Sequence, residues 1–361
     1  MEYFVYMTND CNLNCEYCSV LIDRTQNSIP LRPGDSNAEL IHLIDQTQII
    51  QNDSYVTVYF FGGEPSLEYH ASIRMMRDMQ RELNKYSLKF ILHTNGLLLH
   101  KIPDELLEQL SAIVCSINYE KIPNHSLANS YFSQVLDNVI LIKKRTNITI
   151  IGRMTITEKT SLYTELLQFS HFFDYIYWQI ENTPNFIDYR NFYETYTYEM
   201  RITFSYWMQY LQNGILLKYV PFMAATRFLL FHDRPKTTFS CGYGSGMVYV
   251  QTDGACYACS DSIENGIHYI GSVTKGVNLP KPSLMAYRCA KCGFRPLCLG
   301  RCGRMHKEFT KKQISRYCAL NKSMFKLFMS NKECLEFIIA AHPLLSDKFM
   351  ESALDLTELT P

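Results

Sequence analysis

The chain has 361 residues, and its 35 Lys and Arg residues balance its 35 Asp and Glu residues. This balance excludes an electrostatic basis for a nucleic-acid or membrane-surface partner. The N-terminus lacks a basic stretch followed by an apolar one, and no run of about 18 apolar residues occurs. We therefore expect a cytoplasmic protein, long enough for one large domain with an appendage or for two medium domains.

Apolar, β-branched or aromatic runs alternate with helix-length periodic segments over residues 1–215. The runs predict strands over residues 3–7, 55–61, 88–93, 112–117, 148–156 and 175–180. The periodic segments predict helices over residues 37–50, 69–85, 104–110, 131–145, 162–172 and 191–212. Six such units predict an α/β fold with a parallel sheet.

Three cysteines follow the first predicted strand, in the sequence Cys11-Asn12-Leu13-Asn14-Cys15-Glu16-Tyr17-Cys18. This spacing lets one loop supply three thiolates to a [4Fe-4S] cluster and leaves one iron without a protein ligand. An open iron can bind a small molecule. The alternative is a zinc site, but zinc prefers four closed ligands, and no fourth Cys or His lies close by on this loop.

The second predicted strand ends in Gly62-Gly63-Glu64-Pro65. Glycines permit a close backbone approach to a ligand, and the Glu64 carboxylate can accept a hydrogen bond from an ammonium group. Taken alone, the same four residues are also typical of a turn before a helix.

Polar residues also stand at the ends of the later strands: Asn95, Ser116 with Asn118, Arg153 and Gln179. The Arg153 guanidinium suits bidentate carboxylate recognition, or it is a surface charge at a strand end. Ser116 and Asn118 either bond a ligand or cap their strand. Cys115, beside Ser116, is expected to be a small buried side chain.

The remaining segments connect this region to the C-terminus. The tyrosine-rich residues 189–210 are expected to be half-buried core. A loop-like stretch with Pro221 follows, and we place a domain boundary between about 214 and 240. The last residues predict helices over 320–329 and 332–341, with a weaker tail from 346.

Eight of the 13 cysteines lie in a second constellation: Cys241, Cys256, Cys259, Cys289, Cys292, Cys298, Cys302 and Cys318. An odd total with short spacings favours metal ligation in a reducing compartment over a disulfide framework. Thr252-Asp253-Gly254 is a hairpin signal, which places Cys256 and Cys259 on or after a returning strand. Four closed thiolates suit either an iron–sulfur cluster or zinc.

The three-cysteine loop, with an aromatic residue before its last Cys, resembles the signature of the radical S-adenosylmethionine (SAM) enzymes. Gly62, Gly63, Glu64 and Pro65 resemble the motif by which these enzymes bind the SAM amino group. The resemblance implies a partial (β/α)6 barrel in which the open iron binds SAM. It also implies reductive cleavage of SAM to a 5'-deoxyadenosyl radical, and contacts to SAM from Asn95, Ser116, Asn118, Arg153 and Gln179.

The second constellation resembles the SPASM domain of peptide- and protein-modifying radical SAM enzymes. By this resemblance Cys289, Cys292, Cys298 and Cys318 hold an outer auxiliary [4Fe-4S] cluster. Cys241, Cys259 and Cys302 hold an inner one, whose fourth ligand is either Cys256 or a substrate thiol on an open iron. The implied cofactors are three [4Fe-4S] clusters and SAM. The implied domains are the barrel at 1–215, a bridging region with the SPASM domain at 216–320, and C-terminal helices at 321–361.

The resemblance implies an oxidoreductase that cross-links or oxidises a ribosomally synthesised peptide (RiPP). It also implies that the enzyme receives electrons from an external one-electron donor of the flavodoxin or ferredoxin type. One alternative is a sulfatase-maturase-like enzyme. In those relatives an Asp follows the Cys that corresponds to Cys259, whereas here Ser260 stands at that place and Asp261 one residue further on. Asp261 is thus the candidate catalytic residue for proton removal. The other alternative is a non-catalytic iron–sulfur or zinc protein that serves electron transfer or scaffolding.

Overall fold

Parallel strands with helices between them form the core of the computed structural model. The structure describes residues 1–13, 15, 18, 35–117, 125–183, 185–234, 239–261, 263, 266–280, 287–351, 354, 356 and 359–361. The chain folds as two compact units, each made of two segments. The first comprises Met1–Ile150 and Gly242–Pro282, and the second Ile151–Cys241 and Ser283–Pro361.

The sheet of the first unit has the strand order β10-β9-β8-β7-β1-β2-β3-β4. Strands β7, β1, β2, β3 and β4 pair in parallel, whereas β7, β8, β9 and β10 pair as antiparallel neighbours. The strands are β1 (Glu2–Thr8), β2 (Tyr55–Gly62), β3 (Ser87–Thr94), β4 (Ala112–Ser116), β7 (Met247–Val250), β8 (Ala255–Tyr257), β9 (Tyr269–Ser272) and β10 (Gly276–Val277).

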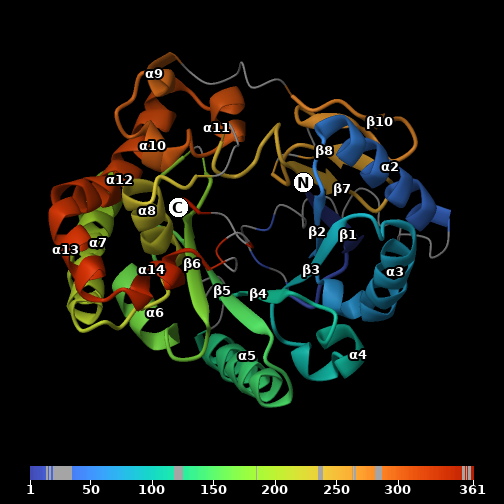
Figure 1. Cartoon of the computed structure of the whole chain (residues 1–361), viewed down its shortest axis with the longest axis horizontal. Coiled ribbons are helices and arrows are strands. Elements are labelled where there is room, and N and C mark those ends of the chain that lie inside the picture. The colour runs from blue at the N-terminus through green and yellow to red at the C-terminus, as the bar shows by residue number, and fades with distance from the viewer. Residues whose placement is uncertain are drawn as a thin grey trace. The chain divides into compact units, whose positions relative to one another are not determined.

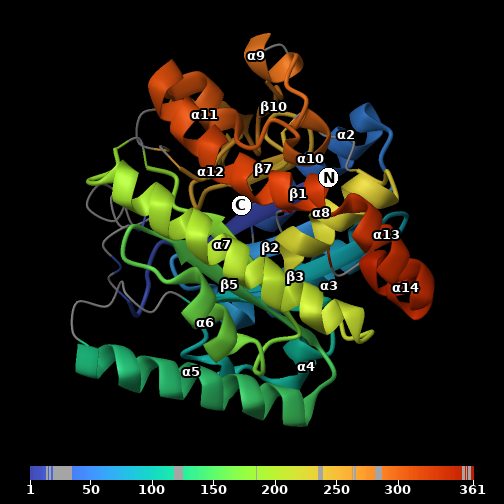
Figure 2. The same ribbon diagram turned by 90° about the vertical axis from the view of Figure 1, so that its left-hand side faces the viewer.

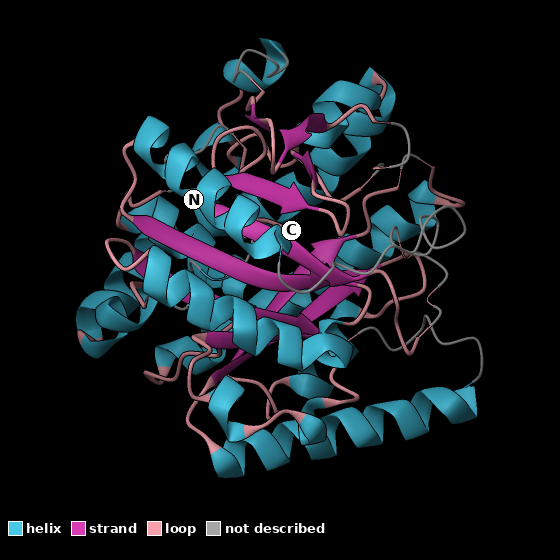
Figure 3. Ribbon diagram, turned by 90° about the vertical axis from the view of Figure 1, so that its right-hand side faces the viewer, coloured by secondary structure: helices cyan, strands magenta, loops and turns pink. Residues whose placement is uncertain are grey.

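Helices connect the parallel strands of this unit. They are α2 (Asp35–Gln51), α3 (Tyr69–Glu82), α4 (Asp104–Leu107) and α5 (His125–Arg145), with short 3₁₀ turns η1 (Pro65–Glu68) and η2 (Leu99–Lys101). Figure 1 labels α2 and α3 beside β1, β2 and β3, and Figure 3 shows helices in cyan crossing in front of strands in magenta. The alternation follows from buried β-branched and aromatic runs separated by amphipathic segments.

A ladder of aromatic rings joins β7 to β1 and β2. Phe4 pairs in register with Tyr59 on one side and with Tyr249 on the other. Its ring stacks on both, with centroid distances of 4.1 Å to Tyr59 and 4.6 Å to Tyr249. Because cross-strand aromatic pairs stabilise a sheet, these rings favour this register for a strand that lies far along the chain from β1 and β2.

The second unit contains the parallel pair β5 (Thr149–Ile156, whose first two residues belong to the first unit) and β6 (Tyr175–Ile180). Its helices are α6 (Leu162–Phe169), α7 (Tyr189–Gln212), α8 (Val220–Leu230), α9 (Tyr287–Ala290), α10 (Arg295–Cys298), α11 (Gly303–Glu308), α12 (Lys311–Ser330), α13 (Lys332–Ala341) and α14 (Leu344–Phe349). Helices α7 and α12 lie side by side (Figure 2). Phe204, Trp207, Phe222 and Phe328 pack their rings together and join α7, α8 and α12.

The six predicted strands are confirmed to within one residue at each end. The expectation of a loop around Pro221 is wrong, because Val220–Leu230 forms the buried helix α8 with Pro221 in its first turn. Proline is tolerated there because the first N–H groups of a helix have no partner within the helix. Helix α12 begins at Lys311 rather than at 320, since Thr310 and Gln313 form a capping box.

Among the described residues, no helix is both long and apolar enough to cross a membrane. The division into domains at 1–215, 216–320 and 321–361 stays a prediction. The two compact units differ from it because β7 to β10, which follow residue 240, pack with the first strands.

Candidate functional site

The carboxyl ends of β1 and β2 are joined directly in front of the first cysteines. The Gly63 amide donates to the Thr8 carbonyl at 2.8 Å, and the Glu64 amide donates to the Asp10 carbonyl at the same distance. Asp10 immediately precedes Cys11. The Gly62–Glu64 turn is therefore the backbone support on which the three-cysteine loop starts.

Both glycines of this turn are required by close packing. Gly62 has φ of +120°, and a Cβ on it would lie 2.4 Å from the Thr8 carbonyl oxygen. A Cβ on Gly63 would lie 2.1 Å from the Asp10 carbonyl oxygen. The sequence suggested approach to a ligand, whereas in this structure the glycines let the chain approach itself.

We expect Gly63→Ala to displace the cysteine loop, because the new methyl group would overlap backbone that cannot rotate away. The expected result is a loss of about 2 kcal/mol or more in stability and reduced iron binding at Cys11, Cys15 and Cys18. Thermal unfolding and iron analysis under anaerobic conditions measure both quantities. Gly266→Ala is a matched control, because a Cβ there meets no atom within 4 Å, although its positive φ adds backbone strain. Equal iron contents in the two variants would contradict the role assigned to Gly63.

The carboxylate of Glu64 is wholly buried and joins the ends of β2 and β3. Its Oε1 accepts from the Ser66 amide at 3.1 Å, from the Thr94 hydroxyl at 2.6 Å and from the Ser66 hydroxyl. Its Oε2 accepts from the Asn95 amide at 2.8 Å. Burial raises the pKa of Glu64, and these donors oppose the rise. Glu64 therefore positions the strand ends, and Oε2 accepts fewer of these hydrogen bonds than Oε1 does.

Asn95 connects this buried carboxylate to the cysteine loop. Its side-chain amide donates to Asn12 Oδ1 at 2.7 Å and lies 3.8 Å from Cys11 Sγ. Its Oδ1 accepts from the Leu97 amide at 3.1 Å. In this structure the described contacts of the Asn95 side chain are to the protein's own loops, so contact with SAM stays a prediction.

The cysteine loop is described at Cys11, Cys15 and Cys18. The Leu13 amide donates to Cys11 Sγ at 3.4 Å, and the Cys18 amide donates to the Cys15 carbonyl at 3.1 Å. All three thiols are partly exposed and carry no disulfide. Three accessible thiols on one loop are a donor set that fits a cluster with one open iron.

At the end of β4, Ser116 is half-buried and Cys115 is fully buried. The prediction of a small buried side chain at Cys115 is thus confirmed, and burial raises the pKa of its thiol. Asn118 lies outside the described residues, and its role stays a prediction.

Arg153 and Gln179 are brought together in the second unit by the pairing of β5 with β6. Arg153 is in register with Tyr177, and its guanidinium donates to the Gln179 side-chain oxygen. The same guanidinium lies 5.9 Å from the centre of the Tyr177 ring. Both predicted residues therefore stand on neighbouring strands as one polar pair.

The hairpin of β7 and β8 carries Cys256 and Cys259, as predicted from its turn, where Gly254 has φ of +84°. Cys256 is buried, and its Sγ lies 3.7 Å from the Gly254 carbonyl. Burial and then the charge of Asp253 raise the pKa of Cys256 to about 12. A buried thiol of high pKa becomes a ligand only when a metal displaces its proton.

Tyr6 on β1 is influenced by residues from both chain segments of the first unit. Burial is the main cause that raises the pKa of Tyr6 far above its usual value, and the charges of Asp261, Cys259 and Cys18 add to it. Cys259 and Asp261 thus lie near the same side chain as the last cysteine of the first loop. The candidate catalytic Asp261 is one of the residues whose charge acts on Tyr6, and its role stays a prediction.

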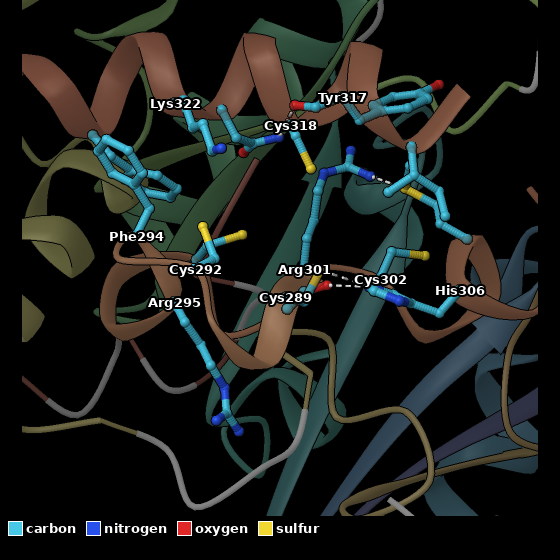
Figure 4. Close-up of a pocket in the computed structure, with 16 residues that line it drawn as sticks. Cys289, Cys292, Phe294, Arg295, Arg301, Cys302, His306, Tyr317, Cys318 and Lys322 are labelled. Atoms are coloured by element: carbon cyan, nitrogen blue, oxygen red, sulfur yellow. Dashed lines mark hydrogen bonds between the residues drawn. The ribbon is translucent and has the colours of Figure 1, made fainter. Parts of the chain in front are cut away.

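Five cysteines of the second unit line one pocket (Figure 4): Cys289, Cys292, Cys298, Cys302 and Cys318. Cys318 comes from α12, and its sulfur points toward the segment that carries Cys289 and Cys292. The pocket therefore contains all four expected ligands of the outer cluster, together with Cys302.

The thiols of this pocket influence one another. Burial, as the largest cause, and the charges of Cys318, Cys289 and Cys292 together raise the pKa of Cys298 to about 12. Thiols that disfavour one another's ionisation are compatible with a bound metal group, whose positive charge favours the thiolates. In the described part of the chain, no three His, Cys, Asp or Glu side chains converge to form a site for a single metal ion. A [4Fe-4S] cluster needs no such convergence, because each thiolate binds a different iron.

Arg301 is a residue of this pocket that sequence reasoning missed. It is 8% exposed, and its guanidinium donates to the Pro361 carbonyl at 2.7 Å and the Ile180 carbonyl at 3.2 Å. It lies 4.7 Å from the centre of the Tyr317 ring, and its charge lowers the pKa of Cys298. A buried cation beside thiols stabilises the thiolate form. The signal available in the sequence was an Arg inside a run of cysteines.

Cys241 lies beside the segment that carries Arg301 and Cys302. The Cys241 amide donates to the Arg301 carbonyl at 3.4 Å, and the Ser240 hydroxyl donates to the same oxygen at 2.9 Å. Cys302 Sγ lies 3.6 Å from the side-chain amide of Asn182. Two of the expected inner-cluster ligands are thus neighbours in the second unit. Cys256 and Cys259 belong to the first unit, so the composition of that cluster stays a prediction.

Comparison with known proteins agrees with this arrangement of strand ends and cysteines. Residues 5–157 match the family model described as the Radical SAM superfamily, so this part of the chain is similar to a radical SAM domain. No curated protein sequence matches the chain.

Solved structures of anSMEcpe, an anaerobic sulfatase-maturase, are similar to the whole chain. Hexahistidine-tagged anSMEcpe with bound AdoMet has a TM-score of 0.71 and 19% identity, over 98% of this chain and 98% of that one. Native anSMEcpe with bound AdoMet and Cp18Cys peptide has a TM-score of 0.69 and 18% identity, over 95% of this chain and 99% of that one. At this identity the likeness shows the fold, so the predicted α/β fold with a parallel sheet core and a helical C-terminal region is confirmed.

Proposed function

We propose that this protein is a radical SAM enzyme that cross-links or oxidises a ribosomally synthesised peptide. The observation that carries the proposal is the Gly62–Glu64 turn, which bonds to Thr8 and Asp10 directly before Cys11. This turn supports the start of a loop with three thiols, within the residues that match the Radical SAM family model. A cluster that serves only as an electron carrier is usually held by four protein ligands, whereas this loop supplies three.

The expected cofactors are SAM and three [4Fe-4S] clusters, held by Cys11, Cys15 and Cys18 and by the second cysteine constellation. When bound, the cluster on Cys11, Cys15 and Cys18 together with SAM would supply one-electron chemistry for hydrogen-atom abstraction from a peptide carbon. The chain's own task is to orient the reactants and exclude water. Glu64 and Asn95 hold the cysteine loop in place, and the guanidinium of Arg153, which also donates to Gln179, is suited to bind the SAM carboxylate.

A peptide partner is supported by the similar structures, since anSMEcpe has been crystallised with Kp18Cys and Cp18Cys peptides. The cysteine pocket of the second unit would store or pass on the electrons that leave an oxidised substrate. Clusters ligated by cysteines operate over a wide range of potentials, around −0.4 V for the plant-type ferredoxins.

The likeness to anSMEcpe over the whole chain favours a second candidate, a sulfatase-maturase-like enzyme acting on a protein. Asp261 would then remove a proton from the substrate. Ser260, rather than an Asp, directly follows Cys259, which supports the peptide-modifying function over this one. No modification of a sulfatase-derived peptide by the wild type would contradict the sulfatase assignment, and retained activity of Asp261→Asn on such a peptide would contradict the role of Asp261.

We expect the reconstituted protein to form 5'-deoxyadenosine from SAM under dithionite, and to do so faster with its substrate peptide. Liquid chromatography with mass spectrometry measures both the nucleoside and the mass change of the peptide. Peptides encoded beside the gene, with repeated Cys or aromatic residues, are the first to test. A loss of two hydrogens from such a peptide supports the proposal, and the absence of 5'-deoxyadenosine under all conditions rejects it.

A further inference from the structure

A groove of about 670 Å³ lies in the second unit beside the cysteine pocket. Helix α7 contributes Tyr193, Thr197 and Arg201 to its walls, and α12 contributes residues from Ser315 to Leu327. The α7 residues are four positions apart and therefore share one face of that helix. This face belongs to the tyrosine-rich segment for which the sequence indicated no site.

The groove opens onto the expected ligands of the outer cluster. Cys289, Cys292 and Cys318 line both the groove and the cysteine pocket. Figure 4 shows Cys318 on α12 near Lys322, with Cys292 and Phe294 on the facing segment. A molecule seated in the groove would thus come close to three of the four expected ligands.

The groove is positively charged. Arg201, Lys322 and Lys326 line it, and its lining contains no Asp or Glu. The Lys322 ammonium lies 5.5 Å from the centre of the Phe294 ring, and Arg201 and Lys326 are exposed.

Acidic residues on α7 have partners elsewhere. Glu194 pairs with Arg190 at 3.0 Å, and Glu199 accepts from the Ser161 hydroxyl at 2.8 Å. In the described part of the chain, no ion pair joins Arg201, Lys322 or Lys326 to a carboxylate. These cations are available to a negatively charged partner.

We propose that this groove docks an acidic ferredoxin-type electron carrier, which exchanges electrons with the outer cluster. The inference rests on the proposed function, in which electrons leave an oxidised substrate. One electron leaves the reduced outer cluster, which is oxidised, and enters the oxidised carrier, which is reduced. No covalent bond breaks and no proton moves. The reduction potentials of the [4Fe-4S] cluster and of a ferredoxin cluster overlap. Electron transfer between them therefore depends more on a short distance than on a difference in potential.

Charge complementarity favours a compact acidic protein over other polyanions. The chain as a whole is neutral, and the groove presents three cations from two helices, fewer than the long basic stripe typical of nucleic-acid binding. Local charges of this kind accelerate encounter and select the orientation of a partner. An acidic segment of the peptide substrate is the competing occupant, and the test below separates the two.

The experiment measures binding of an acidic plant-type [2Fe–2S] ferredoxin to the reconstituted full-length protein by anaerobic titration calorimetry. The groove variant is Arg201→Glu with Lys326→Glu, since both side chains are exposed. The matched control is Arg74→Glu with Lys275→Glu, which makes the same charge change at exposed positions of the first unit. We expect Kd to rise about tenfold or more in the groove variant and less than about twofold in the control. Wild-type Kd should also rise with added salt, because salt screens exposed charges.

Stopped-flow reduction of the ferredoxin by the prereduced protein provides a second readout, which should slow in the groove variant alone. Equal affinities and rates in the two variants would overturn the proposal. Loss of substrate-peptide binding with unchanged ferredoxin binding would also overturn it and would assign the groove to the peptide. Cleavage of SAM with dithionite bypasses the carrier, so its absence in the wild type would reject the proposed function without affecting the binding result.

Discussion

Replacing Cys11, Cys15 and Cys18 together with Ala is expected to abolish 5'-deoxyadenosine formation from SAM. The reconstituted wild type should hold about 12 iron atoms per chain, and the variant about 8, because one cluster of four irons loses all its ligands. Iron, sulfide and zinc analysis after anaerobic reconstitution measures the change. The result would separate the cluster that binds SAM from the auxiliary clusters.

Cys334→Ala is the control for this experiment. Cys334 is exposed on α13 and stands outside both cysteine motifs, so its removal should leave iron content and SAM cleavage unchanged. A wild type with about four iron atoms and zinc in the remainder would indicate a structural second constellation. Oxidative cross-linking would then lack its electron acceptors. An unchanged iron content in the triple variant would place the first cluster elsewhere.

Replacing Glu64 with Ala is expected to lower the free energy of unfolding by about 3 kcal/mol. The change leaves the Thr94 hydroxyl, the Ser66 amide and the Asn95 amide without their buried acceptor. The first cluster should bind iron more weakly as well, because Asn95 holds the loop at Asn12. Chemical denaturation of the apo protein measures the first effect, and iron content measures the second.

Glu64→Gln separates the shape of this side chain from its charge. Its oxygen can still accept from Ser66 and Thr94, while its NH2 group faces the Asn95 amide as a second donor, so a loss of about 1 kcal/mol is expected. Equal losses in the Gln and Ala variants would contradict the acceptor role.

The difference in stability between the wild type and Glu64→Gln should depend on pH, because the pKa of Glu64 is raised. The folded protein favours the protonated form of the Glu64 carboxyl. The contribution of Glu64 to the free energy of unfolding is therefore complete below the ordinary Glu pKa of 4.5, and it is lost as the pH rises through the raised pKa of the folded state. The stability advantage of the wild type over Glu64→Gln should therefore decrease as the pH rises across that window. Denaturation series on both proteins measure the difference. A growing advantage would mean that burial does not control this carboxyl.

Much of the arrangement of strands could be predicted from local signals. Buried runs such as Tyr55–Gly62 and Tyr175–Ile180 are β-branched or aromatic, and turn or cap residues bound them. Such signals act over a few residues, which is why strand ends agree within one residue. Helix α8 was missed because nearly all of its residues are apolar and Pro221 stands in its first turn, so it lacks a clear amphipathic period.

Long-range pairing could not be predicted in this way. Strand β7 lies beside β1, with the rings of Tyr249 and Phe4 stacked in register, and nothing near Tyr249 in the sequence identifies that partner. The same limit applies to Arg301, whose burial depends on carbonyls of Ile180 and Pro361. It also applies to the groove, whose cations come from two helices distant in sequence.

The sequence by itself determined which chemistry is available: the number and spacing of the thiols, the glycine pair and the strands that carry them. These are local properties, since ligand spacing and backbone freedom depend on neighbouring residues. Only the tertiary structure decided that Glu64 is buried beneath four donors, that the glycines contact Thr8 and Asp10, and that Arg301 lies among the thiols. The physical reason is that burial, pKa and close packing depend on which distant segments meet, and folding alone brings them together.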